Sequence, residues 1–370
     1  MHAIETAAQR QYYSRPADER YATLQAYHEA AHADRAACRT ARAPLSALRV
    51  EPAPDGVQLR GSTMSAGLTP WAYGQLCSTL GAPVAYLRRQ DPELQAQCLT
   101  ADLTRYQLSD PDAASDPRKL LIRNGSTGAP TIRAFTSSRY SRLWDADIAD
   151  LLLQAHDRRP ALDLPPVWEG GRGGAYRSDR DSFVLLTDGG SIVTDPTIGS
   201  RGDGRMFRGV IVVNSEVGAS TYRHIGFWLR SVCGNLLLSG VETVVQLDRR
   251  HVGRGFLPEV AGSFVRLLRW LDRPESEDRR IIDAMLDARL GNTEQDAARE
   301  LTRILKGLPG STATAALQRA AQTEPGDPFT YWAAWQGLTR ISQDAGHMGD
   351  RFDLDLLAAQ LQRRALRVAA

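Results

Sequence analysis

Runs of alternating apolar residues, separated by turn sequences, occupy the middle of this chain and then stop. They recur between residues 48 and 251, whereas no such run follows Leu257. Alternation with a period of two is typical of half-buried strands, and the amphipathic stretches around it are typical of helices. The sequence therefore predicts an α+β protein, with an antiparallel or mixed β-sheet core, flanking helices and an α-helical C-terminal region.

Turn and capping residues mark individual elements. A hairpin is expected over 48–61, because two short apolar runs flank a Pro-Asp-Gly turn. A helix is expected over 68–81, where Thr69 can cap the start and Gly81 can end it. Further expected elements are helices over 17–42, from Asp91 and over 145–156, two strands within 119–140, and strands over 182–195, 206–218 and 241–251.

The 370 residues are enough for two or three domains. We expect an N-terminal helical segment (1–44), an α+β core (45–273) and an α-helical C-terminal region (274–370). No stretch approaches the length of apolar sequence that spans a bilayer, and the N-terminus lacks the apolar core of a signal peptide. A cytoplasmic protein without membrane association is therefore expected.

The stretch AYHEAAHADR contains the pattern H-E-x-x-H. Four residues apart, His28 and His32 share one helix face and can both reach a zinc ion, and Glu29 can act as general base. The extended form of this motif would need a third histidine at Cys38, and Asp34 stands where such helices usually carry an uncharged residue. The sequence therefore favours an incidental pattern on a solvated helix, keeps a metal site as the alternative, and predicts no cofactor.

Arginine dominates the basic residues. The formal net charge is only +2, yet 43 of the 45 lysines and arginines are arginine. A GC-rich genome is one explanation for this bias. The physical consequence is the same in either case, because the planar guanidinium binds phosphate in a fork and stacks on aromatic rings.

One stretch is strongly basic: six basic residues and no acid lie between Asp116 and Asp145, with aromatic residues among them. On a hairpin alternate residues share a face, so Arg133, Phe135 and Ser137 are expected to point the same way. Such a face suits single-stranded nucleic acid, and the alternative is a solvated surface whose aromatic residues anchor the core. The predicted contacts are Arg118, Lys119, Arg123, Arg133, Arg139, Tyr140 and Arg142.

A second basic segment follows at residues 248–255, DRRHVGRG. Its two glycines allow the backbone to approach a phosphate closely. The alternative is a turn after a strand, with the arginines held in ion pairs. The predicted contacts are Arg249, Arg250, His251 and Arg254.

The stretch VNSEVG places Glu216 beside Asn214 and Ser215. With Asp181 or His251 nearby, this cluster could bind a metal or transfer protons. A strand end whose side chains bond to backbone groups is the favoured alternative. A P-loop ATPase is disfavoured, because no G-x-x-x-x-G-K-[ST] motif occurs.

Three short motifs, N-S-E-V-G, C-G-N and R-H-x-G, follow one another along the chain. In this order they resemble the phage- and plasmid-associated family catalogued as domain of unknown function 932. The resemblance covers roughly residues 45–270 and implies a mobile-element setting, but no defined reaction. The implied motif positions, without assigned roles, are Asn214, Ser215, Glu216, Gly218, Cys233, Gly234, Asn235, Arg250 and His251.

The sequence thus predicts a phage- or plasmid-associated protein that binds or anneals single-stranded DNA in recombination or replication, more a binding protein than an enzyme. Annealing long strands needs a continuous basic groove, so a homo-oligomer is expected by analogy. One alternative is a metal-dependent hydrolase or nuclease that uses His28, Glu29 and His32 or the Glu216 cluster. Another is a protein-interaction factor directed against the host, whose helical tail docks on a partner.

Overall fold

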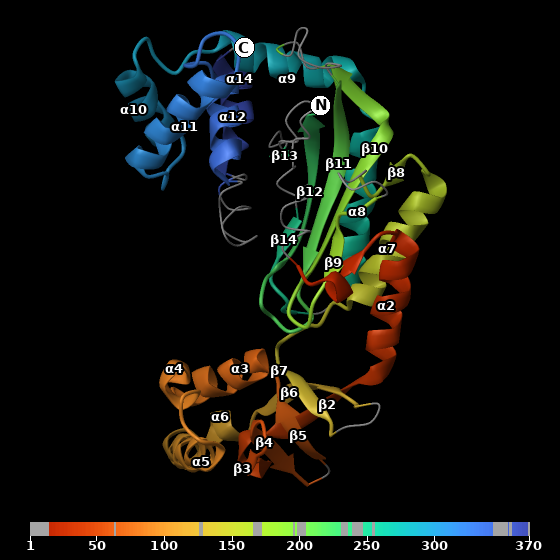
Figure 1. Cartoon of the computed structure of the whole chain (residues 1–370), viewed down its shortest axis with the longest axis vertical. Coiled ribbons are helices and arrows are strands. Elements are labelled where there is room, and N and C mark those ends of the chain that lie inside the picture. The colour runs from red at the N-terminus through yellow and green to blue at the C-terminus, as the bar shows by residue number, and fades with distance from the viewer. Residues whose placement is uncertain are drawn as a thin grey trace.

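The chain folds into two lobes, each built on its own β-sheet (Figure 1). The predicted α+β class is confirmed. Among the described residues, no helix is both long enough and apolar enough to cross a membrane. The computed structural model describes residues 15–62, 64–125, 129–165, 172–194, 197, 205–230, 236–238, 247–253, 256–342, 354 and 357–368.

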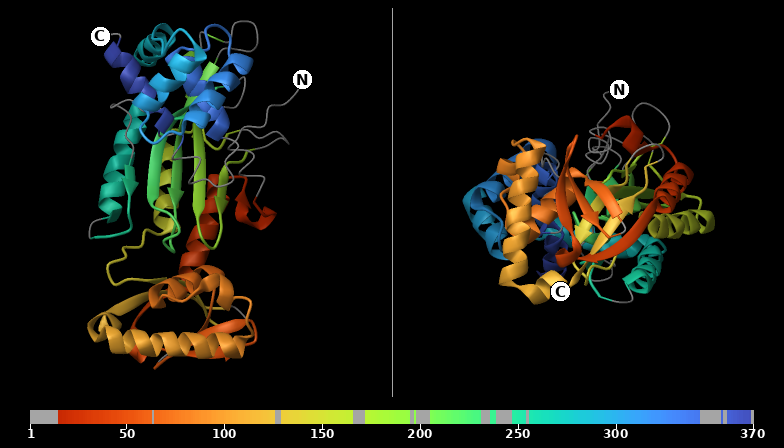
Figure 2. Two further views of the ribbon diagram at one scale, coloured as in Figure 1. Left: turned by 90° about the vertical axis from the view of Figure 1, so that its left-hand side faces the viewer. Right: turned by 90° about the horizontal axis from the view of Figure 1, so that it is seen from below.

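The smaller lobe contains residues 38–136, and its described strands form a sheet of order β2-β6-β7-β5-β4-β3. Neighbouring strands are antiparallel except β5 and β7, which are parallel. The helices of this lobe pack on one face of the sheet around Leu59, Leu76, Leu99 and Phe135 (Figure 2). The elements are β2 (Cys38–Pro44), β3 (Arg49–Ala53), β4 (Gly56–Gly61), β5 (Met64–Leu68), α3 (Pro70–Leu80), α4 (Val84–Leu87), α5 (Pro92–Ser109), α6 (Pro111–Ser115), β6 (Pro117–Arg123) and β7 (Thr131–Thr136), with a short 3-10 helix at Leu45–Ala47.

Local sequence explains much of this lobe. The hairpin predicted over 48–61 is confirmed, because β3 and β4 pair across the Pro-Asp-Gly turn. The helix predicted over 68–81 is α3. The Thr69 side chain caps it by accepting a hydrogen bond from the third following residue, and Gly81 ends it in the left-handed conformation.

The helix predicted over 17–42 is wrong at both ends. Helix α2 covers Leu24–Ala37, and the Thr23 side chain caps its start. The next seven residues form strand β2, which pairs along its whole length with β6. Cross-strand pairing therefore outweighs the helical pattern there, and the N-terminal segment expected to be helical to residue 44 ends in a strand.

The larger lobe contains residues 15–37 and the described residues from 137 onward. Its antiparallel sheet has the order β1-β9-β10-β11-β12-β13, with β8 beside β10 and β14 beside β12. Helices α2, α7 and α8 cover one face, around Tyr27, Leu152, Val210 and Phe264 (Figure 1). The elements are β1 (Arg20–Tyr21), α7 (Asp145–Arg158), β8 (Leu162–Asp163), β9 (Ala175–Arg177), β10 (Ser182–Thr194), β11 (Arg205–Asn214), β12 (Tyr222–Arg230), β13 (Leu236–Leu238), β14 (Leu247–Arg249) and α8 (Phe256–Leu271), with a 3-10 helix at Ala17–Glu19.

The remaining helices pack at the end of this sheet that lies away from the smaller lobe (Figure 1). Trp228 of β12 contacts Trp335 of α12, with ring centroids 5.8 Å apart. Gly337 allows α11 and α12 to touch, because a Cβ there would lie 2.0 Å from the Ala316 carbonyl oxygen. The described residues after Leu257 contain helices and no strand, as predicted: α9 (Glu275–Asp287), α10 (Glu294–Ile304), α11 (Gly310–Thr323), α12 (Tyr331–Ser342) and α14 (Gln360–Val368).

The lobes divide the chain at 37/38 and 136/137, which differs from the division expected at 44/45 and 273/274. One hydrophobic core joins Leu24 of α2, Val210 of the sheet and Trp335 of α12. The N-terminal and C-terminal helices therefore share a core with the second sheet, because their apolar faces are buried against it.

Candidate functional site

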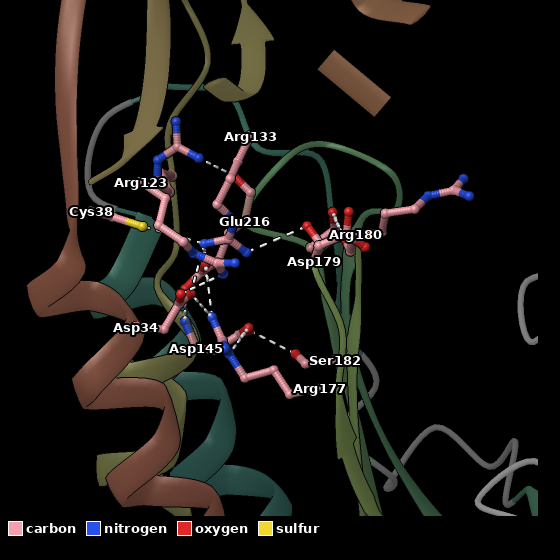
Figure 3. A network of polar contacts seen from close by, with 12 residues as sticks. Asp34, Cys38, Arg123, Arg133, Asp145, Arg177, Asp179, Arg180, Ser182 and Glu216 are labelled. Carbon is pink, nitrogen blue, oxygen red and sulfur yellow. Dashed lines mark hydrogen bonds and ion pairs between the residues drawn. The ribbon is translucent and has the colours of Figure 1, made fainter. Parts of the chain in front are cut away.

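Buried charges fill the junction between the lobes (Figure 3). Asp34 of α2, Asp145 at the start of α7, Arg177 of β9 and Glu216 after β11 come from the larger lobe, and Arg133 comes from β7 of the smaller lobe. The side chains of Arg133 and Glu216 are only 2% and 1% exposed. We call these five residues the junction network.

Each carboxylate of the junction network contacts a guanidinium. Arg133 Nη1 lies 2.7 Å from an Asp34 oxygen and 3.1 Å from a Glu216 oxygen. Arg177 donates to Asp145 at 2.9 Å and also contacts Asp34 and Glu216. At the N-terminus of α7, the backbone N–H of Asp145 donates to Glu216 at 2.9 Å. The network therefore joins the lobes while leaving none of its carboxylates unpaired.

The pKa values of two carboxyl groups in the network are shifted in opposite directions. Burial, together with the neighbouring Asp145, raises the pKa of Glu216 in spite of Arg177 and Arg133. Burial also opposes ionisation of Asp34, but Arg177 and Arg133 outweigh it and lower the pKa of Asp34. Of these two carboxyls, Glu216 takes up a proton first as the pH falls.

Arg133 reaches the junction because β7 is bulged. The pairing register shifts between Leu121 and Ile122 of β6, which leaves Arg133 as the extra residue of β7. Phe135 instead packs in the core of the smaller lobe. The prediction that Arg133 shares a face with Phe135 and Ser137 is therefore wrong, because the bulge breaks the alternation on which it depends.

The N-S-E-V-G motif begins at the last residue of β11 and continues into the following loop, which reaches the smaller lobe. The Val217 carbonyl accepts hydrogen bonds from Trp71 at 3.0 Å and from Gln75 at 2.8 Å, both on α3. Asn214 donates to the backbone carbonyl that precedes α7 at 3.1 Å, and Ser215 donates to a carbonyl of the neighbouring loop at 2.6 Å. These bonds fit the favoured alternative, in which the side chains satisfy backbone groups at a strand end.

A cavity of about 880 Å³ opens beside this loop, between α3 and the larger lobe. Three arginines line it, Arg88, Arg118 and Arg180, against a single acid, Asp179. The guanidinium of Arg180 lies 4.6 Å from the centroid of the half-buried Trp71 ring. The lining is therefore positively charged and includes an aromatic face.

Tyr140 and Gly218 form one wall of this cavity. Gly218 has a φ of +80°, and a Cβ there would lie 3.2 Å from the Tyr140 ring. The His251 ring stacks on the Tyr140 ring of this wall, with the two ring centroids 5.3 Å apart. The Ser141 N–H donates to the His251 carbonyl at 2.8 Å, so the two predicted basic segments lie side by side.

Acids from distant segments neutralise part of the first basic stretch. Arg133 and Arg123 both pair with Asp34. Arg142 donates to the backbone carbonyl of Glu216. With its side chain 2% exposed, Arg133 presents no surface to a ligand, so it is not the nucleic-acid contact that the sequence predicts.

Other residues of the stretch remain near or at the surface. Arg118 lines the cavity, and within the described part of the chain its buried Nε has no hydrogen-bond partner. Lys119 donates to the Tyr140 carbonyl at 2.5 Å, and burial with the nearby Arg42 lowers the pKa of Lys119. Arg139 is exposed.

In the second segment, Arg249 pairs with Glu259 at 3.0 Å and Arg250 is exposed. His251 is 4% exposed, and burial lowers its pKa to about 4, so it is neutral at pH 7 and not a phosphate contact in this conformation. Arg254 lies outside the described residues. So do Cys233, Gly234 and Asn235.

In the H-E-x-x-H stretch, His28 and His32 share one face of α2, as their spacing predicts. Both Nε2 atoms lie against the same carboxylate oxygen of Asp150 on α7, at 2.8 and 2.9 Å. Glu29 is exposed and accepts a hydrogen bond from Gln25 at 2.7 Å. The sequence offered no third ligand because Asp150 approaches α2 only in the folded chain.

Sequence reasoning missed most of the cavity lining. Trp71, Gln75 and Ser78 lie on one face of α3 at helical spacing, and this stripe of non-aliphatic residues was the available signal. Arg88 directly follows α4 in the same lobe as α3, whereas Arg180 lies in a bend of the larger lobe whose position beside α3 depends on the approach of the two lobes. No local pattern predicts that approach.

Comparisons with known proteins identify no relative. No family model matches the chain, and neither a curated protein nor a solved structure matches it. The resemblance to the phage- and plasmid-associated family stays a prediction carried by three short motifs.

Proposed function

We propose that this protein binds single-stranded nucleic acid, with phosphates and a base held in the cavity between the lobes. The observation that carries the proposal is the lining of three arginines, Arg88, Arg118 and Arg180, against one acid. Guanidinium groups bind phosphate through paired hydrogen bonds, and a positive cleft attracts polyanions over a distance.

The shape and the aromatic lining favour a single strand. A cavity of about 880 Å³ is of the size that holds a small molecule, so it admits a nucleotide or two and excludes a duplex. The Trp71 ring, over which Arg180 now lies, can stack with a base when that guanidinium turns to a phosphate, and such stacking tolerates any base. Arg139 and Arg250 are exposed and precede Tyr140 and His251, the two stacked rings of this wall, so they add positive charge near it.

The same proposal includes the finer setting expected from the sequence. It places the protein in the cytoplasm, on a phage or plasmid, as a homo-oligomer that anneals strands in recombination or replication. The motif resemblance and the need for a continuous groove support this setting.

The test is fluorescence anisotropy of the full chain with a labelled single-stranded oligonucleotide at two salt concentrations. Three phosphate contacts give a slope of about −2 in log K against log salt, so affinity should fall about twentyfold from about 50 to about 200 mM salt. The exposed pair Arg88→Glu and Arg180→Glu should weaken binding more than about tenfold.

The matched control is Arg299→Glu, because this arginine is 75% exposed on α10, remote from the cavity. Its affinity for the oligonucleotide should stay within about twofold of that of the unaltered chain. Unlabelled duplex and a mononucleotide serve as competitors, and the mononucleotide should compete weakly if a strand is the ligand. An absence of binding at low salt, or equal losses in the cavity variant and in the control, would overturn the proposal.

A further inference from the structure

Three metal-binding side chains converge between helices α2 and α7, and none of them lines the cavity. His28 and His32 contribute Nε2 and Asp150 contributes a carboxylate oxygen, and all three atoms lie within 4.8 Å of one another. The two imidazoles lie one turn apart with ring centroids separated by 4.4 Å. The side chains are 24%, 42% and 41% exposed, so the point at which they meet is open to solvent.

We propose that His28, His32 and Asp150 bind a divalent transition-metal ion of the zinc class. Two imidazoles and one carboxylate form a ligand set that zinc and ferrous ions accept, with the remaining positions open to water. Magnesium and calcium prefer oxygen ligands alone and are disfavoured here. This site supplies the third ligand that H-E-x-x-H lacks in the sequence.

The distances require only a small adjustment. In a tetrahedral zinc site with bonds of about 2.0–2.1 Å, neighbouring ligand atoms are about 3.4 Å apart. The carboxylate oxygen now lies 2.8 and 2.9 Å from the two nitrogens. Asp150 would therefore withdraw by about 0.5 Å, which a half-exposed side chain can do by rotation.

The surroundings set the expected affinity. Metal-bound histidines usually donate their other ring N–H to a carbonyl or carboxylate, and this bond orients the ring. The buried Nδ1 of His28 has no such partner among the described residues. Binding should therefore be micromolar, weaker than in sites where outer hydrogen bonds fix each ring.

A bound ion would clamp the helix pair that leads into the junction. One turn farther along α2, Arg35 pairs with Asp147 of α7 at 2.6 Å, and α2 also carries Asp34. The metal would add a cross-link to this pair, independent of any nucleic acid. It is therefore a stabilising site, and Glu29 has no part in it.

The experiment titrates Zn²⁺ alone into the full chain by calorimetry, after EDTA treatment and dialysis. We expect saturable binding of one ion per chain, a rise in melting temperature with Zn²⁺, and visible absorption bands when Co²⁺ replaces it. His32→Ala and Asp150→Asn should each weaken binding by more than about tenfold, and both positions are exposed enough for the variants to fold.

Glu29→Gln is the matched control, because it changes the same motif without touching the three ligands. It should bind Zn²⁺ as the unaltered chain does, and Mg²⁺ should give no heat with either protein. Binding of equal affinity in Asp150→Asn would assign the ion to adventitious surface groups and overturn the proposal. An absence of saturable Zn²⁺ binding at millimolar concentration would also overturn it.

Discussion

Replacing Arg133 by methionine tests how strongly the junction network holds the fold together. The guanidinium is 2% exposed and contacts carboxylates that are 11% and 1% exposed, those of Asp34 and Glu216. Methionine keeps much of the side-chain volume but removes the charge. Loss of one partner of a buried ion pair costs about 3–5 kcal/mol, and because Arg177 still contacts both acids, we expect the lower end, about 3 kcal/mol.

The pH dependence of this loss is a second signature. The pKa of Glu216 is already raised, and removal of a guanidinium raises it further. A carboxyl whose folded pKa exceeds the unfolded value binds its proton preferentially in the folded state, so acidification recovers stability as the pH falls toward that raised pKa. The deficit of Arg133→Met should therefore become smaller as the pH is lowered from neutral.

Urea unfolding followed by tryptophan fluorescence measures both effects. The double variant Arg133→Met with Glu216→Gln should lose less than the sum of the two single changes, with a coupling of about 1–3 kcal/mol. A deficit below about 1 kcal/mol would refute the reasoning, since it would mean that solvent reaches the pair and screens it. Additive single costs with no dependence on pH would refute it as well.

Two further predictions concern buried histidines and the cavity wall. Burial lowers the pKa of His224 to about 3 and of His251 to about 4. Because unfolded histidine binds a proton near pH 6.5, the free energy of unfolding should fall as the pH drops from about 6.5 toward 4, by about 2 kcal/mol per histidine at about pH 5. His224→Gln should remove about half of this dependence in urea titrations, and an unchanged pH profile would contradict the assignment. Gly218→Ala should cost about 1–2 kcal/mol for its left-handed backbone and should also weaken oligonucleotide binding, because the new Cβ meets the Tyr140 ring at 3.2 Å. Gly307→Ala has a similar positive φ, +94°, at a position that does not line the cavity, so it should lose stability but not affinity; equal affinities for the two variants would show that the wall does not matter.

Local chemistry predicted those elements whose boundaries are set within a few residues. Helix α3 begins after Thr69 and ends at Gly81 because a side-chain cap and a left-handed glycine act over three or four residues. The hairpin over 48–61 is fixed by its own turn. The described residues after Leu257 are helical because their sequence lacks alternation, a pattern that needs no distant partner.

Prediction failed where a distant segment decides the local state. The local sequence of β2 favours a helix, but the segment forms a strand because it pairs with β6. Asp150 completes the His28 and His32 cluster from more than a hundred residues away, across a helix contact that neither sequence stretch encodes. Asp34, which counted against a zinc helix in the sequence, instead holds guanidiniums in the junction network.

The basic stretch shows when the net charge of a short sequence segment predicts the charge of the protein surface. The stretch has six basic residues and no acidic one. This composition predicts an exposed positive face only if no acidic side chain from a distant segment pairs with these residues in the fold. In the fold, Asp34 and Glu216 form ion pairs with Arg133 in the middle of the stretch. The bulge in β7 turns the Arg133 side chain toward these two acids. Among the described residues, the excess positive charge lies instead at the cavity, which Arg118, at the edge of the stretch, lines together with Arg88 and Arg180 from two other segments. Because these three arginines come from both lobes, the phosphate binding proposed for the cavity would depend on the junction network that holds the lobes together. Arg133→Met should therefore weaken oligonucleotide binding although Arg133 itself is buried.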